Sequence, residues 1–152
     1  MKAPFTTRRT VEFAETDLAG IAHFSNFFRW MESAEHEFVR SLGGVVHGQE
    51  EDLRYGFARA HASCDYRRSV TYLDELEIEV RLTQRSSKSL TYAFRFVRLP
   101  AQEGEEATEV ATGRLEVVCV TKPPGSDRIR ATNIPPALEA ALASALDPDP
   151  AP

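Results

Sequence analysis

The segment that decides the fold is residues 11–30, which read Val11-Glu-Phe-Ala-Glu-Thr-Asp17-Leu-Ala-Gly20-Ile-Ala-His23-Phe24-Ser-Asn26-Phe-Phe-Arg-Trp30. It joins a β-like stretch to a helix through a tight loop that carries one carboxylate, Asp17. Backbone N–H groups at the start of a helix have no partner within the helix and carry partial positive charge. A carboxylate that faces such donors is able to attack, or to activate water against, a carbonyl that the donors polarise.

The stretch from about Ser25 to Leu42 is predicted to be a long amphipathic helix. Ser25 or Asn26 suits the N-cap, and Gly43-Gly44 suits the end of the helix. The apolar residues recur at spacings of three and four, which places one stripe on the helix: Phe27, Trp30, Met31, Ala34, Phe38 and Leu42.

The segments around this helix favour strands. Residues 5–15 are predicted as a first strand, and residues 45–56 as polar and irregular. After that the apolar residues alternate at a period of two in four runs, at about 60–67, 76–83, 90–97 and 111–122. Short turns between these runs predict an antiparallel meander. A short strand within 126–131 and a short helix from Ile134 complete the prediction.

Length and composition indicate one soluble globular domain over residues 1–146, followed by a Pro- and Asp-rich tail at 147–152 that we expect to be disordered. No apolar run approaches the roughly 18 residues of a membrane span. The first residues lack the apolar core of a signal peptide, so we expect a cytoplasmic protein. The net charge of −5 argues against nucleic acid as a partner, although local basic clusters at Arg67-Arg68 and at 85–89 would suit a small polyanion.

Cysteine and histidine usage gives no sign of a metal centre. Cys64 and Cys119 lie in strand-like runs without CxxC spacing, so we expect buried, reduced thiols. The four histidines show no shared ligand spacing: His23, His36, His47 and His61. We therefore expect neither a metal nor a cofactor.

The chain resembles the 4-hydroxybenzoyl-CoA thioesterase family of the hotdog fold over roughly residues 7–140. The most specific feature is the Asp17-x-x-Gly20-Ile pattern, with Asn26 ahead of Phe28-Arg29-Trp30 and a helix that closes on Leu42-Gly43. Supporting segments are Asp65-Tyr66-Arg67, Asp74-Glu75-Leu76, Arg85-Ser-Ser-Lys88-Ser89 and Ile134-Pro135. The resemblance implies an α+β hotdog fold, with an antiparallel sheet of five to six strands around one long central helix.

The resemblance also implies hydrolysis of an acyl-CoA thioester, with the CoA thioester as substrate. Asp17 would act as nucleophile or as general base, the backbone N–H groups of Phe24 and Ser25 would polarise the carbonyl, and Asn26 would hold the loop. Active sites would lie between the subunits of a homodimer or homotetramer. The CoA phosphates would lie at a basic turn, where the matching residues are Arg85, Ser87, Lys88 and Ser89.

One departure and several alternatives accompany this interpretation. Many relatives carry Tyr or His seven residues after the aspartate, where this chain has Phe24, and its histidine falls at His23. His23 would orient water or substrate, or would only fill space in the loop. Asp17 would otherwise be a turn residue, and Glu32 is a second carboxylate that would approach the interface. The alternative functions are a hotdog hydratase or dehydratase, and a non-catalytic protein that binds acyl-CoA or an acyl carrier.

Overall fold

The computed structural model describes residues 2–148. Most of the predicted tail, residues 149–152, lies outside the described residues. Asp147, the first residue of that tail, donates its backbone N–H to the carbonyl of Leu82 at 2.8 Å and pairs with Arg81. None of the helices within residues 2–148 combines the length and the apolar character that crossing a membrane would need.

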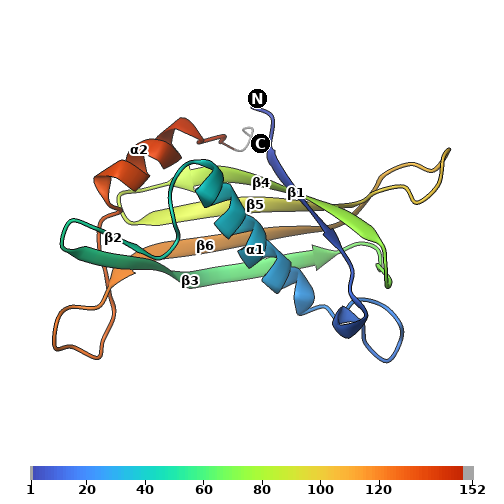
Figure 1. Cartoon of the computed structure of the whole chain (residues 1–152), viewed down its shortest axis with the longest axis horizontal. Coiled ribbons are helices and arrows are strands. Elements are labelled where there is room, and N and C mark those ends of the chain that lie inside the picture. The colour runs from blue at the N-terminus through green and yellow to red at the C-terminus, as the bar shows by residue number, and fades with distance from the viewer. Residues whose placement is uncertain (1, 149–152) are drawn as a thin grey trace.

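The sheet is antiparallel and curled, and seven strands form it within residues 2–148 (Figure 1). Five of them are long: β1 (Phe5–Thr10), β3 (Leu53–Tyr66), β4 (Glu75–Arg85), β5 (Ser89–Arg98) and β6 (Thr108–Thr121). Two are short, β2 (Gly48–Glu50) and β7 (Arg130–Ala131). The order is β1-β4-β5-β6-β3-β2, with β7 beside β6. The prediction of five to six strands missed β2.

Helix α1 (Asn26–Ser41) crosses one face of the sheet and buries its apolar stripe against it (Figure 1). The predicted helix therefore exists within one residue of its expected bounds. Phe27, Trp30, Met31 and Ala34 are almost wholly buried. The helix ends before Gly43, whose φ of +85° is a conformation that glycine adopts without strain.

Two predicted boundaries were wrong. The first strand ends at Thr10, and Phe13–Glu15 form a short 3₁₀ helix, η1, that turns the chain toward the Asp17 loop. Phe13 is therefore 73% exposed, whereas Val11 is fully buried. The stretch 45–56, predicted as irregular, contains β2 and the first residues of β3.

A second helix, α2 (Pro136–Ser144), lies at the opposite end of the molecule from η1 (Figure 1). Its bounds agree with the short C-terminal helix predicted from Ile134 onward. Leu138 and Leu142 bury its apolar side. The carboxylate of Glu50 accepts the backbone N–H groups of Ala137 and Leu138 at 3.0 and 3.4 Å, which caps the start of α2.

Candidate functional site

The loop from Thr16 to Ser25 places Asp17 beside the start of α1. The backbone N–H of Asp17 donates to Ile21 at 2.8 Å, and the N–H of Gly20 donates to the Asp17 carbonyl at 3.0 Å. Gly20 has a φ of +85°, which lets the loop turn this tightly. The N–H of Ala22 donates to Val70 at 2.8 Å, so the loop is also held from the turn before β4.

The Asp17 carboxylate is half-buried and uses only one of its two oxygens within the described part of the chain. Oδ1 accepts the backbone N–H of Ala19 at 2.8 Å, an Asx-type turn contact. None of residues 2–148 donates to Oδ2. The turn contact fixes the carboxylate's orientation and leaves an oxygen for another partner.

Glu15 accepts four hydrogen bonds, two of which tie this loop to helix α1. Its backbone carbonyl accepts the N–H of His23 at 2.8 Å and the Nδ2 of Asn26 at 2.7 Å. Its carboxylate accepts the indole N–H of Trp30 at 2.6 Å and the backbone N–H of Glu12 at 2.8 Å. Asn26, expected to hold the loop, is buried and makes that contact through Glu15.

The N–H groups at the helix start differ in how they are used. The N–H groups of Asn26, Phe27 and Phe28 each donate to the carbonyl three residues back. The N–H of Ser25 reaches Nδ1 of His23 at 3.3 Å. The N–H of Phe24 has no acceptor among residues 2–148. At the start of helix α1, the N–H of Phe24 is therefore free and the N–H of Ser25 is weakly held.

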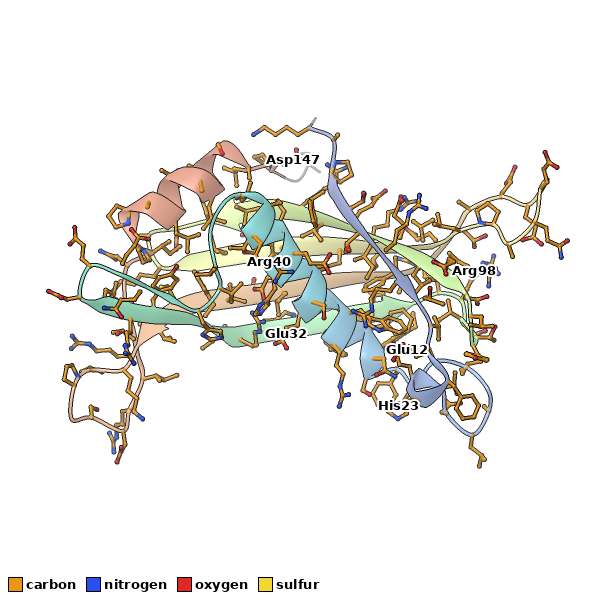
Figure 2. The ribbon with its side chains drawn as sticks, viewed as in Figure 1. Glu12, His23, Glu32, Arg40, Arg98 and Asp147 are labelled. Carbon is orange, nitrogen blue, oxygen red and sulfur yellow. The ribbon has the colours of Figure 1, made fainter. Side chains whose placement is uncertain are left out.

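His23 is exposed at the end of the molecule where α1 begins (Figure 2). Its Nδ1 lies 2.7 Å from the Oγ of Ser25, and its ring stacks on Phe24 with a centroid distance of 4.6 Å. Ser25 stands at the N-cap, but its side chain bonds His23 and does not cap the helix. Neither residue lines the pocket described next.

A pocket of about 350 Å³ lies beside Asp17, and its lining combines apolar and aromatic residues with two arginines. It is lined by Asp17, Ile21, Ala22, Phe24, Phe27, Tyr66, Arg67, Arg68, Ser69 and Val70. Asp17 and Phe24 are thus the predicted catalytic residues that share one cavity within the chain. Arg67 pairs with Glu109 at 3.5 Å, so it is the less available of the two arginines.

The sequence profile of the thioesterase-like superfamily matches residues 11–142, which contain the loop, the helix, the pocket and the sheet. The chain belongs to this superfamily. The predicted resemblance and the class of thioester hydrolase are therefore confirmed at the level of the family, and the fold is of the hotdog type.

Three relatives illustrate the match. A protein of Aquifex aeolicus described as an esterase is 36% identical to this chain over 91 residues. The match covers 60% of this chain and 70% of the Aquifex protein. A 1,4-dihydroxy-2-naphthoyl-CoA hydrolase of Prochlorococcus marinus is 30% identical over 59% of this chain and 64% of its own. A crystal structure of a 4-hydroxybenzoyl-CoA thioesterase mutant with bound 4-hydroxybenzoyl-CoA has a TM-score of 0.75 at 19% identity, and covers 90% of this chain and 96% of that one.

Within one chain of this thioesterase-like protein, the predicted CoA-binding turn lies far from Asp17. This turn joins the end of β4 at Arg85 to the start of β5 at Ser89, with Ser87 and Lys88 between them, whereas the Asp17 loop packs against the segment before β4 (Figure 1). At about 3.3 Å per residue the eleven-residue strand between them spans roughly 33 Å. The structure therefore does not bring the two sets together in one protomer.

The turn itself is well ordered by its own contacts. The Oγ atoms of Ser86 and Ser89 are 2.6 Å apart, and Arg85 pairs with Glu139 of α2 at 3.0 Å. Lys88 is exposed, and its side chain contacts no acidic group within residues 2–148. Lys88 is thus the cation of this turn that is available to an anionic ligand.

Two residues of the site were missed by sequence reasoning. Glu15 was named only as part of the motif, and Tyr66 only as part of a strand and of the supporting segment Asp65-Tyr66-Arg67, with no role in the site. The hydroxyl of Tyr66 donates to the Phe24 carbonyl at 2.9 Å, and its ring meets Phe27 edge-on at 5.1 Å. Burial and the neighbouring Cys64 raise the pKa of Tyr66 to about 12. Within residues 2–148 no three His, Cys, Asp or Glu side chains are grouped to hold a metal ion.

Proposed function

We propose that this protein hydrolyses an acyl-CoA thioester to a carboxylic acid and CoA, with Asp17 as the reacting carboxylate. The observation that carries the proposal is the pairing of a free carboxylate oxygen and a free backbone N–H at one cavity. Asp17 Oδ2 and the N–H of Phe24 have no partner within residues 2–148, and both residues line the same aromatic pocket. Such a pair suits a carbonyl carbon that is attacked while its oxygen gains charge.

Two routes fit this geometry. As a general base, Asp17 takes a proton from water, the water oxygen attacks the thioester carbon, and the C–S bond then breaks to release CoA thiolate. As a nucleophile, Asp17 attacks the carbon itself, the C–S bond breaks to release CoA thiolate and leave a mixed anhydride, and water then hydrolyses the anhydride to the acid and free Asp17. In both routes the N–H groups of Phe24 and Ser25 receive the oxyanion. Losing one such donor typically costs about 10²–10³ in rate.

A second subunit would complete the site. Strand β3 pairs with β2 only over Leu53–Tyr55, so the edge from residue 56 to Tyr66 has no neighbour within residues 2–148. Antiparallel pairing of this edge with a second copy would set the Tyr66 end of one β3 beside the Leu53 end of the other. The Asp17 pocket would then face the partner's half that carries the turn 85–89. We propose a cytoplasmic homodimer or homotetramer in which CoA bridges two chains.

The relatives indicate which acyl groups to test first. Curated relatives act on 1,4-dihydroxy-2-naphthoyl-CoA, and a protein of the same fold binds 4-hydroxybenzoyl-CoA. The walls of the Asp17 pocket include Phe24, Phe27 and Tyr66. Aromatic rings prefer stacked or edge-on contacts with other rings. Aromatic acyl-CoAs therefore head the panel, with short, medium and long aliphatic chains as comparison.

The test is thiol release from this panel by wild type, Asp17→Asn and Asp127→Asn. Asp127 is exposed in the loop before β7 and serves as a matched Asp-to-Asn control. We expect turnover on at least one substrate, a loss of about 10²-fold or more in Asp17→Asn, and no change in Asp127→Asn. Activity that survives in Asp17→Asn would reject the assigned carboxylate. Tight acyl-CoA binding by wild type without any thiol release would reject hydrolysis in favour of a binding role.

A further inference from the structure

The end of strand β3 reaches the backbone that precedes helix α1. The hydroxyl of Tyr66 donates to the carbonyl of Phe24 at 2.9 Å, across 42 positions of sequence. The same carbonyl accepts the N–H of Phe27 at a longer 3.3 Å. The hydrogen bond from Tyr66 is therefore the shorter of the two that hold the Phe24 carbonyl, and its donor lies outside helix α1.

Holding the Phe24 carbonyl also orients the N–H of Ser25. The two groups belong to one planar trans peptide, in which C=O and N–H point in opposite directions. The preceding peptide is held in the same way, because the His23 carbonyl accepts the N–H of Asn26 at 2.9 Å. That contact fixes the direction of the free Phe24 N–H. Each of the two donors is thus set by a hydrogen bond to the carbonyl on its own peptide.

Tyr66 is itself held rigidly. It pairs with Ala111 of β6 in the sheet register, and the next N–H groups, of Arg67 and Arg68, both donate to the Val110 carbonyl. Its ring meets the buried Phe27 edge-on at 5.1 Å. With a pKa near 12, the phenol keeps its proton, and so its donor character, throughout neutral and mildly alkaline pH. A rigid donor on a sheet is a suitable anchor for a loop peptide.

We infer that Tyr66 is a positioning residue of the reaction: its hydroxyl fixes the peptide between Phe24 and Ser25, whose N–H makes only a long 3.3 Å contact with His23 Nδ1, and so orients this N–H as a second donor to the developing oxyanion. The inference rests on the proposed function. A hydrogen bond to the carbonyl side of a peptide also polarises its N–H, which strengthens the donor. The contribution belongs to the transition state, because negative charge on the substrate oxygen arises only there.

The experiment compares Tyr66→Phe with Tyr72→Phe. Tyr72 is at the same end of the molecule, its ring also meets a phenylalanine edge-on (Phe13, 5.8 Å), and its hydroxyl contacts no residue within 2–148. In Tyr66→Phe we expect kcat to fall on the order of 10-fold, less than the loss of a whole oxyanion donor. We expect the KM of Tyr66→Phe to stay within two-fold of the KM of Tyr72→Phe. We expect the urea unfolding midpoints of the two variants to agree within error.

Each contrary result has a separate meaning. A kcat of Tyr66→Phe equal to that of Tyr72→Phe, with Asp17→Asn inactive, overturns the inference and leaves the proposed function intact. A raised KM with unchanged kcat also overturns the inference, because the tyrosine would then bind substrate. A lowered unfolding midpoint that accounts for the lost activity overturns it too, because the tyrosine would then only stabilise the fold. Full activity in Asp17→Asn rejects the proposed function itself.

Discussion

The Glu15 carboxylate accepts the indole N–H of Trp30 at 2.6 Å, and this contact joins the loop that carries Asp17 to the buried side of helix α1. Trp30 is 1% exposed, so its N–H has no access to water. The other carboxylate oxygen accepts the N–H of Glu12 at 2.8 Å. The Glu15 carboxylate therefore accepts hydrogen bonds from two donors. Because Glu15 lies two residues before Asp17, the position of Asp17 depends on these contacts.

Removing this carboxylate should destabilise the fold. In Glu15→Ala the buried indole N–H loses its acceptor, which typically costs about 1–3 kcal/mol. In a Trp30→Phe background there is no N–H to satisfy, so the same Glu15→Ala change should cost less by on the order of 1 kcal/mol. Urea unfolding of the four proteins of this cycle measures the coupling. Equal costs in both backgrounds would show that Glu15 acts independently of Trp30.

The helix and most of the strands could be predicted because their signals are local. The apolar stripe and the glycine stop placed α1 at 25–42, and the structure has it at Asn26–Ser41. The start of β3 was missed although Leu53, Tyr55 and Phe57 alternate with the period of a strand. A β-bulge between Arg59 and His61 shifts the register, so the inward positions change from odd to even numbers along the strand. A strict period of two in the apolar residues therefore could not connect the part of β3 before the bulge with the part after it.

The site was predictable only where it is local in sequence. Asp17, Gly20 and Phe24 lie within eight residues, and the motif placed them correctly beside the helix start. The contact from Tyr66 to Phe24 depends on how the sheet curls back to the loop, which no spacing in the sequence records. The turn at 85–89 was assigned to the same substrate as Asp17, yet one chain holds the two at opposite ends of β4.

Helix α1 also carries a buried carboxylate, Glu35, whose charged partner Arg59 lies partly in water, and the loss of that partner should be costly. Glu35, 1% exposed, accepts both guanidinium nitrogens of Arg59 at 2.7 Å. Arg59→Met would leave the buried Glu35 carboxylate without this partner; because the Arg59 side chain is 30% exposed, we expect a cost below the about 3–5 kcal/mol typical of a fully buried pair. Replacing both residues, as in Glu35→Leu with Arg59→Met, should recover much of that loss, because apolar groups need no partner.

The matched control is Arg114→Met. Arg114 pairs with Glu116 at 2.6 Å on the exposed face of β6, with nearly half of its side chain in water. An exposed pair contributes about 0–1 kcal/mol, so this change should hardly alter the free energy of unfolding. The comparison is made by urea denaturation. An Arg59→Met protein no less stable than Arg114→Met would contradict a dependence of the helix–sheet contact on this pair.

Gly113 of β6 lies close against Met31 of α1. A Cβ at this position would stand 2.6 Å from the Sδ of Met31, which is 1% exposed. Gly113→Ala should therefore force the methionine out of its packed position and cost about 1–3 kcal/mol. Met31→Ala removes both Sδ and Cε, the two atoms that would clash, so the double variant should lose less than the sum of the single changes. Additive losses in thermal unfolding would show that the Gly113 contact with Met31 is not the cause.

The two thiols predict how stability changes at alkaline pH. Burial raises the pKa of Cys119 to about 11, and burial with a contribution from Asp65 raises that of Cys64 to about 11. Below pH 9 both thiols keep their protons in the folded and the unfolded chain, so their contribution is fully present. Between pH 9 and 11 only the unfolded chain ionises, and the free energy of unfolding should fall as pH rises. Cys119→Ala removes one of these groups and should reduce the slope by up to about 1.4 kcal/mol per pH unit. Urea midpoints from pH 8 to 10.5 under reducing conditions measure it, and an unchanged slope in Cys119→Ala would assign the decline to other groups.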